Sequence, residues 1–290
     1  MYIADFKYHR PASVPEACKM LSEFPEAVLL AGGTDLLVEI RQGLRHPKDI
    51  VSLTDIPELK NINETNGFLI IGAGETHNDI ADSPVVEKFC KTISETASKI
   101  GTDQIRNTGT IGGNLCTGAS CCDFAPILLA LNADVKLIGV SGDRIVPLTE
   151  FFISHKDTRI QKGEILTEII VPRPESGTRT GFEKFGLRNS ASISVVSAAV
   201  SLNILPDDIL ENVSVVLGAV APTPVISFSA NRILNGCNIS DLYENSGLLQ
   251  EVGEAAVKDA KPVSDIRGSD NYRRELIKVL VKRLLLKILD

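Results

Sequence analysis

Residues 101–126 read GTDQIRNTGTIGGNLCTGASCCDFAP, and they lie between two more apolar segments. The stretch is rich in glycine and threonine. Glycine has no side chain beyond the backbone, so it lets the chain approach another group closely. We therefore expect this stretch to be a loop whose backbone contacts a ligand.

A second glycine pair stands earlier, in AGGTDLL at 31–37, directly after the apolar run AVLL. Backbone N–H groups in a tight turn between a strand and a helix form an anion site, and a pyrophosphate would suit it. The alternative is a tight turn in which Asp35 only caps the helix. TIGGN at 110–114 is a similar loop, and the two together favour one extended, phosphate-bearing cofactor. Asp123 could accept hydrogen bonds from its hydroxyl groups.

GAGETH at 72–77 looks like part of a dinucleotide-binding fingerprint, but His77 occupies the third glycine position. We expect Gly72 and Gly74 to be turn residues and His77 to cap a helix or lie on the surface. The sequence shows no catalytic triad pattern, no P-loop and no H-E-x-x-H motif. Cofactor loops without an acid–base set indicate that the cofactor carries the chemistry, so we assign no catalytic residue.

The composition excludes several functional classes. The formal net charge is −7 over 290 residues, which argues against nucleic acid as a partner. The apolar runs are too short for a membrane span, and the sequence starts without an apolar signal segment, so we expect a cytoplasmic protein. The six cysteines are scattered through a long chain, which argues against a disulfide framework, and they include no C-x-x-C pair, which argues against a metal site.

The order of predicted elements indicates an α+β protein with three parts, at 1–54, 55–175 and 176–290. Expected elements include a strand at AVLL, a helix ending at Gly43, one long helix over 83–101, and a hairpin over 134–148. A Pro/Gly/Ser-rich break at 172–181 separates the last part, which has strands and then helices. We expect the basic final helix, 272–290, to pack with a solvated cationic face; docking to a partner is the alternative.

Five segments together resemble one known family. They are AGGTDLL at 31–37, QIRNTGTIGGNL at 104–115, D-x-x-P at 123–126, KFGLRNSASISVVSAAV at 184–200 and GAVAPTPV at 218–225. Their sequences and order are similar to those of the FAD-binding medium subunits of the molybdenum hydroxylases, the xanthine dehydrogenase and carbon monoxide dehydrogenase flavoprotein family. The resemblance implies a two-lobed FAD-binding unit of the vanillyl-alcohol-oxidase (PCMH) type. It also implies a C-terminal domain with a small antiparallel sheet and helices.

The resemblance also implies which residues bind FAD. The first loop would wrap the pyrophosphate, the second would hold the other side of the cofactor, and Asp123 would bind ribityl or adenosine hydroxyls. Ile100 would lie near the isoalloxazine, with Leu166 and Lys184 approaching from across the cleft. The matching positions are Leu29, Leu30, Ala31, Gly32, Gly33, Thr34, Asp35, Leu36, Ile100, Gly109, Thr110, Gly113, Asn114, Cys116, Thr117, Cys122, Asp123, Leu166 and Lys184.

One segment departs from the family pattern N-x-x-x-S-P-x-x-D. Here it reads NLCTGASCCD, with Ala119 and Ser120 in place of the Ser-Pro pair. We expect Cys121 and Cys122 to be small loop residues, and their role stays open. Neither glycine loop contains a histidine for covalent attachment, so we expect noncovalent FAD.

The function implied by the resemblance is electron transfer within a complex. Electrons would come from a partner iron–sulfur subunit, after hydroxylation at a molybdenum-cofactor subunit, and pass to NAD(P)+ or another acceptor. The molybdenum subunit's substrate cannot be read from this sequence. The alternatives are a free-standing FAD-dependent oxidoreductase of the same fold and a flavin-free scaffold subunit.

Overall fold

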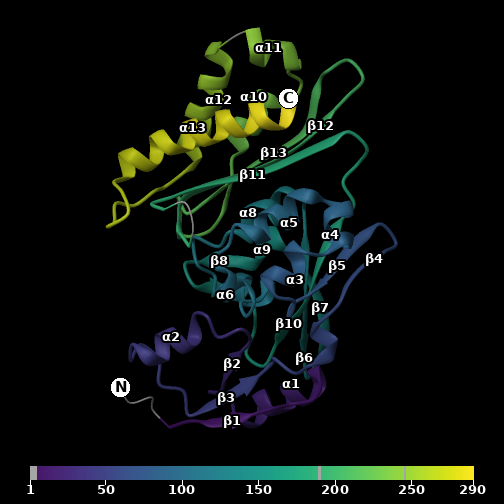
Figure 1. The fold of residues 1–290 in the computed structure, drawn as a ribbon, viewed down its shortest axis with the longest axis vertical. Coiled ribbons are helices and arrows are strands. Elements are labelled where there is room, and N and C mark those ends of the chain that lie inside the picture. Colours follow the sequence, from purple (N-terminus) through teal and green to yellow (C-terminus); the bar gives the residue numbers. More distant parts are fainter. Residues whose placement is uncertain (1–4, 189–190, 245) are drawn as a thin grey trace.

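Three main sheets follow one another along the long axis of the molecule, from the N-terminal region at the bottom of Figure 1 to the C-terminal region at the top. The computed structural model describes residues 5–188, 191–244 and 246–290. Both helices and strands occur in every region, so the chain has the predicted α+β class.

The N-terminal region is a small parallel sheet with strand order β1-β3-β2. Its elements are β1 (Lys7–His9), α1 (Val14–Glu23), β2 (Val28–Leu30), α2 (Leu36–Arg41) and β3 (Asp49–Ser52). Parallel neighbours need crossover connections, and here each crossover contains a helix. Helix α1 begins at Ser13, whose side chain accepts from the Glu16 amide, and it buries Ala17 and Cys18. Strand β2 ends where the first glycine loop begins.

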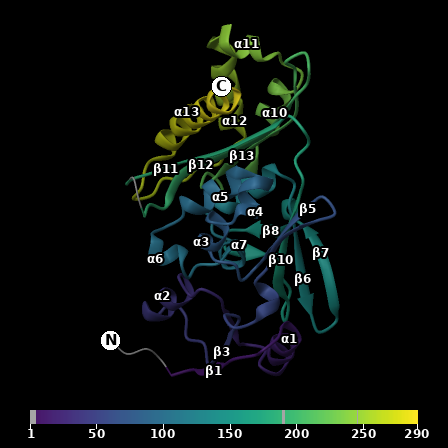
Figure 2. The ribbon, with the colours of Figure 1, turned by 45° about the vertical axis from the view of Figure 1, so that its right-hand side comes forward.

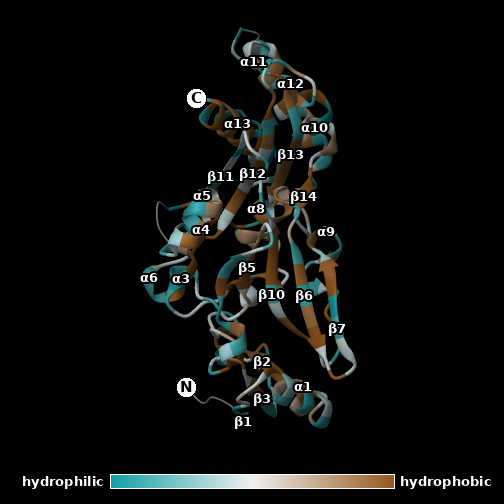
Figure 3. Ribbon diagram, turned by 90° about the vertical axis from the view of Figure 1, so that its right-hand side faces the viewer, coloured by the Kyte–Doolittle hydropathy of each residue, from teal (hydrophilic) through white to brown (hydrophobic). Residues whose placement is uncertain are grey.

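The middle region contains an antiparallel sheet with strand order β4-β5-β10-β6-β7. Its strands are β4 (Ile62–Thr65), β5 (Phe68–Gly72), β6 (Asp134–Gly139), β7 (Gly142–Pro147) and β10 (Ile165–Pro172), with the short pair β8 (Phe152–Ser154) and β9 (Asp157–Thr158) beside it. Its helices are the 3-10 helix η1 (Pro57–Leu59), α3 (His77–Ala81), α4 (Pro84–Phe89), α5 (Lys91–Ser98), α6 (Asp103–Arg106), α7 (Ile111–Cys116), α8 (Phe124–Ala130) and α9 (Leu148–Phe151). The apolar colour of β10 and β6 in Figure 3 marks residues that pack in the main core.

The prediction of one continuous helix over 83–101 is wrong. Cys90 is extended, at φ −157° and ψ 97°, and separates α4 from α5. The break places buried polar groups against the C-terminal region, because the Thr92 hydroxyl donates to the Thr180 carbonyl at 3.1 Å. Helical periodicity alone could not reveal this break, since Val86 and Ile93 on either side of it are both buried.

The C-terminal region has an antiparallel sheet with strand order β11-β12-β13-β14. The elements are β11 (Thr178–Gly186), β12 (Ser194–Ile204), β13 (Leu210–Gly218), β14 (Val225–Ile226), α10 (Phe228–Leu234), α11 (Ile239–Glu244), α12 (Ser246–Asp259) and α13 (Asp270–Leu289). Figure 2 shows α12 and α13 on one face of this sheet and α5 on the other. Both faces are therefore covered, and β12 is buried along almost its whole length.

The two faces of that sheet belong to different cores. Val200 and Leu217 pack with the C-terminal helices, whereas Phe182, Ala199 and Val216 pack with α8 in the core of the middle region. Alternate residues of a strand point to opposite faces, which is why one strand can serve both cores. We keep the division at residues 54 and 175 as a proposal, supported by the three separate sheets.

The final helix differs in part from the prediction of a solvated cationic face. Arg273 is only 4% exposed. Its Nη1 donates to the carbonyls of Val195 at 2.7 Å and Ala219 at 3.0 Å, and its Nη2 pairs with Asp265 at 2.7 Å. Arg273 thus links α13 by hydrogen bonds to the start of β12 and to the residue that follows β13. None of the described helices is long and apolar enough to cross a membrane.

We expect Arg273→Met to lower the free energy of unfolding by about 2–4 kcal/mol, because the carbonyls of Val195 and Ala219 lose a charged donor and Asp265 keeps only its bonds with Arg267. Arg283→Met on the same helix is the matched control, since Arg283 is exposed and its loss should change stability by less than about 0.5 kcal/mol. Urea unfolding of both variants measures the difference. Equal effects would contradict this role for Arg273.

Candidate functional site

The larger of two notable cavities lies between the N-terminal and middle regions and has a volume of about 720 Å³, within the range of cofactor sites. Residues from both glycine loops line it, as do residues from η1, β10, the β8–β9 turn and the connection between β11 and β12. Segments far apart in the sequence therefore meet around one space.

The first glycine loop lines this cavity and carries backbone donors that the described chain does not pair. The amides of Gly32, Gly33 and Thr34 make no hydrogen bond to any residue that the structure describes. Gly33 has φ +71°, which favours glycine. A Cβ atom on Gly32 would lie 1.9 Å from the carbonyl oxygen of Thr108. The first loop thus rests directly on the backbone that leads into the second.

Asp35 does not cap helix α2. Its backbone is helical, at φ −103° and ψ −53°, and its side chain makes no capping hydrogen bond. Asp35 is one of the residues that line the cavity. Desolvation by the surrounding chain raises the pKa of Asp35, and the negative charge of Glu39 raises it further.

The second loop is fixed by its own capping bond and by the turn after β5. The Thr110 hydroxyl accepts from the Gly113 amide at 3.0 Å, which starts helix α7. The Gly112 amide donates to the Ala73 carbonyl at 2.9 Å, and a Cβ on Gly112 would lie 2.6 Å from that oxygen. Gly32 and Gly112 therefore allow close contact between backbones, and Gly33 allows the positive φ of the turn.

The arginine of the QIRN segment holds the loop around the cavity. Arg106 Nε donates to the Asn78 side chain at 3.0 Å, Nη1 donates to the Ile100 carbonyl at 3.1 Å, and Nη2 pairs with Asp103. These bonds join α6, α3 and the end of α5. They keep Ile100, which lines the cavity, in place.

Asp123 connects the cavity to the C-terminal region. Its Oδ2 accepts from Lys184 Nζ at 2.6 Å and its Oδ1 from Ser194 Oγ at 2.5 Å. Lys184 lies on β11 and Ser194 on β12, and all three residues are largely buried. The carboxylate that faces the cavity is thus oriented by two strands of another region.

Most predicted FAD-binding residues line the cavity: Leu29, Ala31, Gly32, Gly33, Thr34, Asp35, Leu36, Ile100, Thr110, Gly113, Asn114, Cys116, Thr117, Asp123 and Leu166. The exceptions are Leu30, whose side chain is buried beside Ile40 and Ile50, and Gly109, Cys122 and Lys184, which are not among the lining residues. Cys122 is buried and donates its thiol to Asn114 Oδ1 at 2.9 Å.

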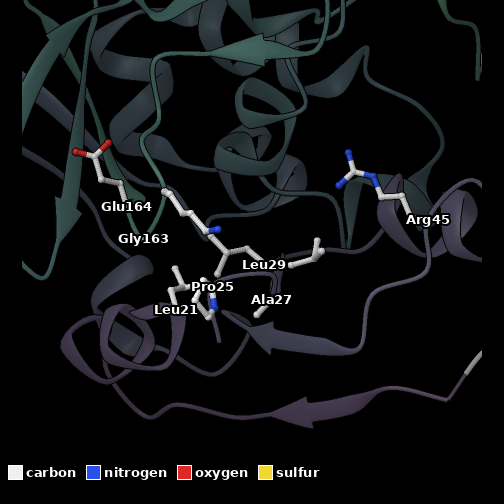
Figure 4. Close-up of a pocket in the computed structure, with 9 residues that line it drawn as sticks. Leu21, Pro25, Ala27, Leu29, Arg45, Gly163 and Glu164 are labelled. Atoms are coloured by element: carbon white, nitrogen blue, oxygen red, sulfur yellow. The ribbon is translucent and has the colours of Figure 1, made fainter. Parts of the chain in front are cut away.

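Sequence reasoning missed an ion-pair group at the cavity edge. Glu39 of α2 pairs with Arg45 and with Lys156 of the β8–β9 turn, each at 2.7 Å, and all three line the cavity. Lys156 lies far from the other two along the chain, so no local pattern could have linked them. A smaller pocket of about 330 Å³ adjoins the cavity and shares Val28, Leu29, Arg45 and Glu164 with it. It is lined on its other side by the end of α1 (Figure 4).

The prediction that His77 caps a helix or lies on the surface is also wrong. His77 is only 3% exposed, lines the cavity, and has its ring centroid 5.5 Å from that of Phe124. Burial, together with the nearby charge of Arg106, lowers its pKa to about 4. His77 is the first residue of the short helix α3, and the sequence around it gave no indication that its side chain would be buried at the cavity.

The cavity's chemistry fits a flavin nucleotide. Free amide donors suit a phosphate group, the Asp123 carboxylate suits hydroxyl groups, and Ile100, Ile105 and Leu166 supply apolar surface for a ring. In the described part of the chain, no three His, Cys, Asp or Glu side chains gather in a way that could hold a metal ion.

Comparison with known proteins decides the family. The family model described as the FAD binding domain in molybdopterin dehydrogenase matches residues 4–174. The chain belongs to this flavoprotein family. A second model, the C-terminal domain of the CO dehydrogenase flavoprotein, matches residues 182–288 of the same chain. The chain is thus an FAD-binding medium subunit of the molybdenum hydroxylase type, and its relatives are subunits of oxidoreductases.

Named relatives of this flavin subunit cover its whole length. It is 31% identical to the carbon monoxide dehydrogenase medium chain of Hydrogenophaga pseudoflava, over 97% of this chain and 96% of that one. It is 28% identical to the xanthine dehydrogenase FAD-binding subunit of Escherichia coli O157:H7, over 96% and 94%. A solved carbon monoxide dehydrogenase from H. pseudoflava matches with a TM-score of 0.94 at 30% identity, covering 100% of this chain and 99% of the other.

We expect Gly32→Ala to destabilise the flavin subunit by about 1–3 kcal/mol and to weaken FAD binding, because the new methyl group cannot fit against the Thr108 carbonyl. Gly139→Ala is the control, since its Cβ would approach the Glu164 side chain at 3.3 Å and backbone atoms only at ordinary contact distances of 3.5 Å or more. Urea unfolding and flavin fluorescence quenching measure the two effects. A Gly32 variant as stable and as tightly binding as the control would contradict the contact between the loops.

Because His77 is buried, we expect the protein to lose stability in acid. The pKa of His77 is depressed, so the unfolded chain takes up a proton below about pH 6.5 that the folded protein does not. The stabilisation is complete above pH 6.5 and is lost as the pH falls toward 4. Between pH 7.5 and 4.5 the wild type should lose about 2.5 kcal/mol more than His77→Phe, as measured by urea unfolding at both values. Parallel losses in the two proteins would show that His77 does not titrate this way.

Proposed function

We propose that FAD binds noncovalently in the 720 Å³ cavity, with its pyrophosphate on the first glycine loop. The observation that carries this proposal is the set of free amides at Gly32, Gly33 and Thr34, which point to an anionic ligand that the described chain does not itself supply. Thr110 and Asn114 of the second loop lie across the cavity and would hold the other side of the cofactor.

Asp123 would accept hydrogen bonds from ribityl or adenosine hydroxyls of the cofactor. Lys184 and Ser194 each occupy one of its oxygens, which fixes the orientation of the carboxylate and leaves lone pairs for a ligand. Ile100 and Leu166 would contact the isoalloxazine. The cofactor supplies electron acceptance and donation, and the chain's residues hold it and shield it from water.

Two features support noncovalent attachment. The segments 29–36 and 109–117 contain no histidine. Cys116 lines the cavity, and no neighbouring cation of the described chain lowers the pKa of its thiol, so the thiol is not activated as a nucleophile. All six cysteines are free thiols in the structure, which fits the reducing cytoplasm.

Within a complex, we propose that this subunit takes electrons from an iron–sulfur subunit that is itself reduced by a molybdenum-cofactor subunit. The electrons would leave to NAD(P)+ or another acceptor. This role is supported by full-length similarity to medium subunits that are named for different reactions, on carbon monoxide and on xanthine. Because those substrates differ, a shared electron-transfer role is the function that suits the common fold.

The visible absorption spectrum of the purified chain tests FAD binding. We expect a flavin spectrum, as isolated or after addition of FAD, and we expect the colour to move to the supernatant after acid precipitation. Colour that stays in the pellet would contradict noncovalent binding. A colourless protein that takes up no FAD would contradict the flavoprotein role. Anaerobic bleaching of the flavin by NADH would then assign the acceptor, and copurified iron and molybdenum would identify the complex.

Asp123→Asn should weaken FAD binding about tenfold or more, because it removes a charged acceptor and its pairing with Lys184. Ser194→Ala should have a smaller effect, since it removes only one orienting bond. Asp241→Asn, on exposed α11, is the control and should bind FAD as the wild type does. Titration of flavin fluorescence gives the three affinities. Unchanged affinity in Asp123→Asn would exclude contact between this carboxylate and the cofactor.

A further inference from the structure

Glu39 of α2 joins the N-terminal region to the middle region by an ion pair. Its Oε1 lies 2.7 Å from Nζ of Lys156, in the turn between β8 and β9, and its Oε2 lies 2.7 Å from Nε of Arg45. All three residues line the cavity. The side chains of the two cations are about half exposed, so water and dissolved ions reach the pair. Such a pair can break while the rest of the protein stays folded.

The position of Glu39 determines the position of the first glycine loop, because this loop leads directly into α2. The Leu37 amide donates to the Gly33 carbonyl at 3.1 Å, and the Glu39 amide donates to the Asp35 carbonyl at 2.9 Å. The loop and the helix therefore form one hydrogen-bonded unit. The unpaired amides of the loop keep their direction only while α2 stays in place.

Lys156 is fixed at the opposite wall of the cavity. Its backbone amide donates to the Gly118 carbonyl at 2.8 Å, and its φ of +59° is uncommon for a residue with a side chain. A Cβ on Gly118 would lie 3.1 Å from the Cα of Lys156, so the turn rests on the backbone just after α7. Helix α7 starts in the second glycine loop. The ion pair therefore links the helix that follows the first loop to the end of the helix that follows the second.

Few other contacts hold α2 in place. Ile40 is buried, and the other residues of α2 are partly or fully exposed. By contrast, α1, the other helix of the N-terminal region, packs in an apolar cluster with Leu59 and Ile165 of the middle region. The N-terminal region is thus attached to the middle region by apolar packing beside α1. Beside α2 it is attached by the ion pair and by the contact between the two glycine loops.

We propose that the ion pair between Glu39 and Lys156 is a clasp that closes the cavity around FAD and keeps the cofactor bound. While the pair is intact, α2 holds the first loop against the pyrophosphate. When the pair breaks, α2 and the loop move away from the second loop and the cofactor can leave. This inference rests on the proposed FAD site. Lys156 acts through Glu39 and α2, so it is a positioning residue.

The rate at which FAD leaves the protein tests the clasp. Lys156→Met removes the pair but leaves Glu39 bonded to Arg45, so the buried carboxylate keeps a partner and the variant should fold. We expect FAD to dissociate about three- to fivefold faster, as the loss of one partly exposed ion pair allows. Lys156→Arg keeps the charge and should restore most of the wild-type rate. The rise in flavin fluorescence after dilution of the FAD-loaded proteins gives these rates.

Lys162→Met is the matched control. Lys162 also pairs with a glutamate of the N-terminal region, Glu26, at 2.7 Å. It does not line the larger cavity, however, and it lies beside the end of α1, where apolar packing already joins the two regions. Its loss should leave the FAD dissociation rate unchanged. An equal rise in Lys156→Met and Lys162→Met, or no rise in Lys156→Met, would overturn the inference.

Glu39→Gln separates the clasp from direct attraction between Lys156 and the cofactor. If Lys156 retained FAD only by attracting its phosphates, removing the neighbouring negative charge would slow dissociation. The clasp predicts faster dissociation, because an amide holds Lys156 less tightly than a carboxylate does. Slower loss of FAD from Glu39→Gln would therefore contradict the clasp while leaving the FAD site intact.

Salt gives a second measurement on the same proteins. Raising the salt concentration from about 0.05 to 0.5 M screens the pair, so it should speed FAD loss in the wild type more than in Lys156→Met. Equal salt dependence in the two proteins would also contradict the clasp. A wild type that binds no FAD would instead contradict the proposed function itself.

Discussion

The site depends first on a contact between two backbones. Gly32 lies so close to the carbonyl of Thr108 that no other residue fits there. This contact brings the N-terminal parallel sheet to the loop of the middle region. It also explains why the amides beside Gly32 stay free: the loop is held by packing, so its own donors need no partners within the chain. Close packing of glycine loops thus creates both the cavity wall and its binding groups.

The third region contributes to the same site from outside the cavity. Lys184 and Ser194 orient Asp123, and Arg273 in turn fixes the start of β12, where Ser194 lies, by binding the Val195 carbonyl. The C-terminal helix is therefore connected to a cavity residue through a short series of hydrogen bonds. The ion pair between Lys184 and Asp123 orients the carboxylate more than it stabilises the fold, because the cost of removing both charges from water offsets much of their attraction.

The sequence predicted the parts of this site that depend on local patterns. Glycine pairs after an apolar strand and an aspartate before a helix are visible in one dimension, and the family resemblance implies that they surround FAD. It could not predict features that arise from tertiary contacts. The break at Cys90 follows from contacts with β11. His77 is buried because Gly109 packs against it. Arg273 is buried because it binds two carbonyl groups that lie far away in the sequence. Asp35 sits at a capping position, yet its side chain makes no capping bond and the residue lines the cavity.

Strand β12 carries a consequence for how the chain can be divided. One face of its sheet completes the core beneath α8, and the other completes the core beneath α13. A cut in the connection between β10 and β11 would therefore leave two fragments that still share an apolar interface. Neither fragment would be a self-sufficient folding unit, because each would expose one side of an interior. A chain shortened to the cofactor-binding segments would expose the apolar face of α8, so the two parts that the family models match separately share one interior.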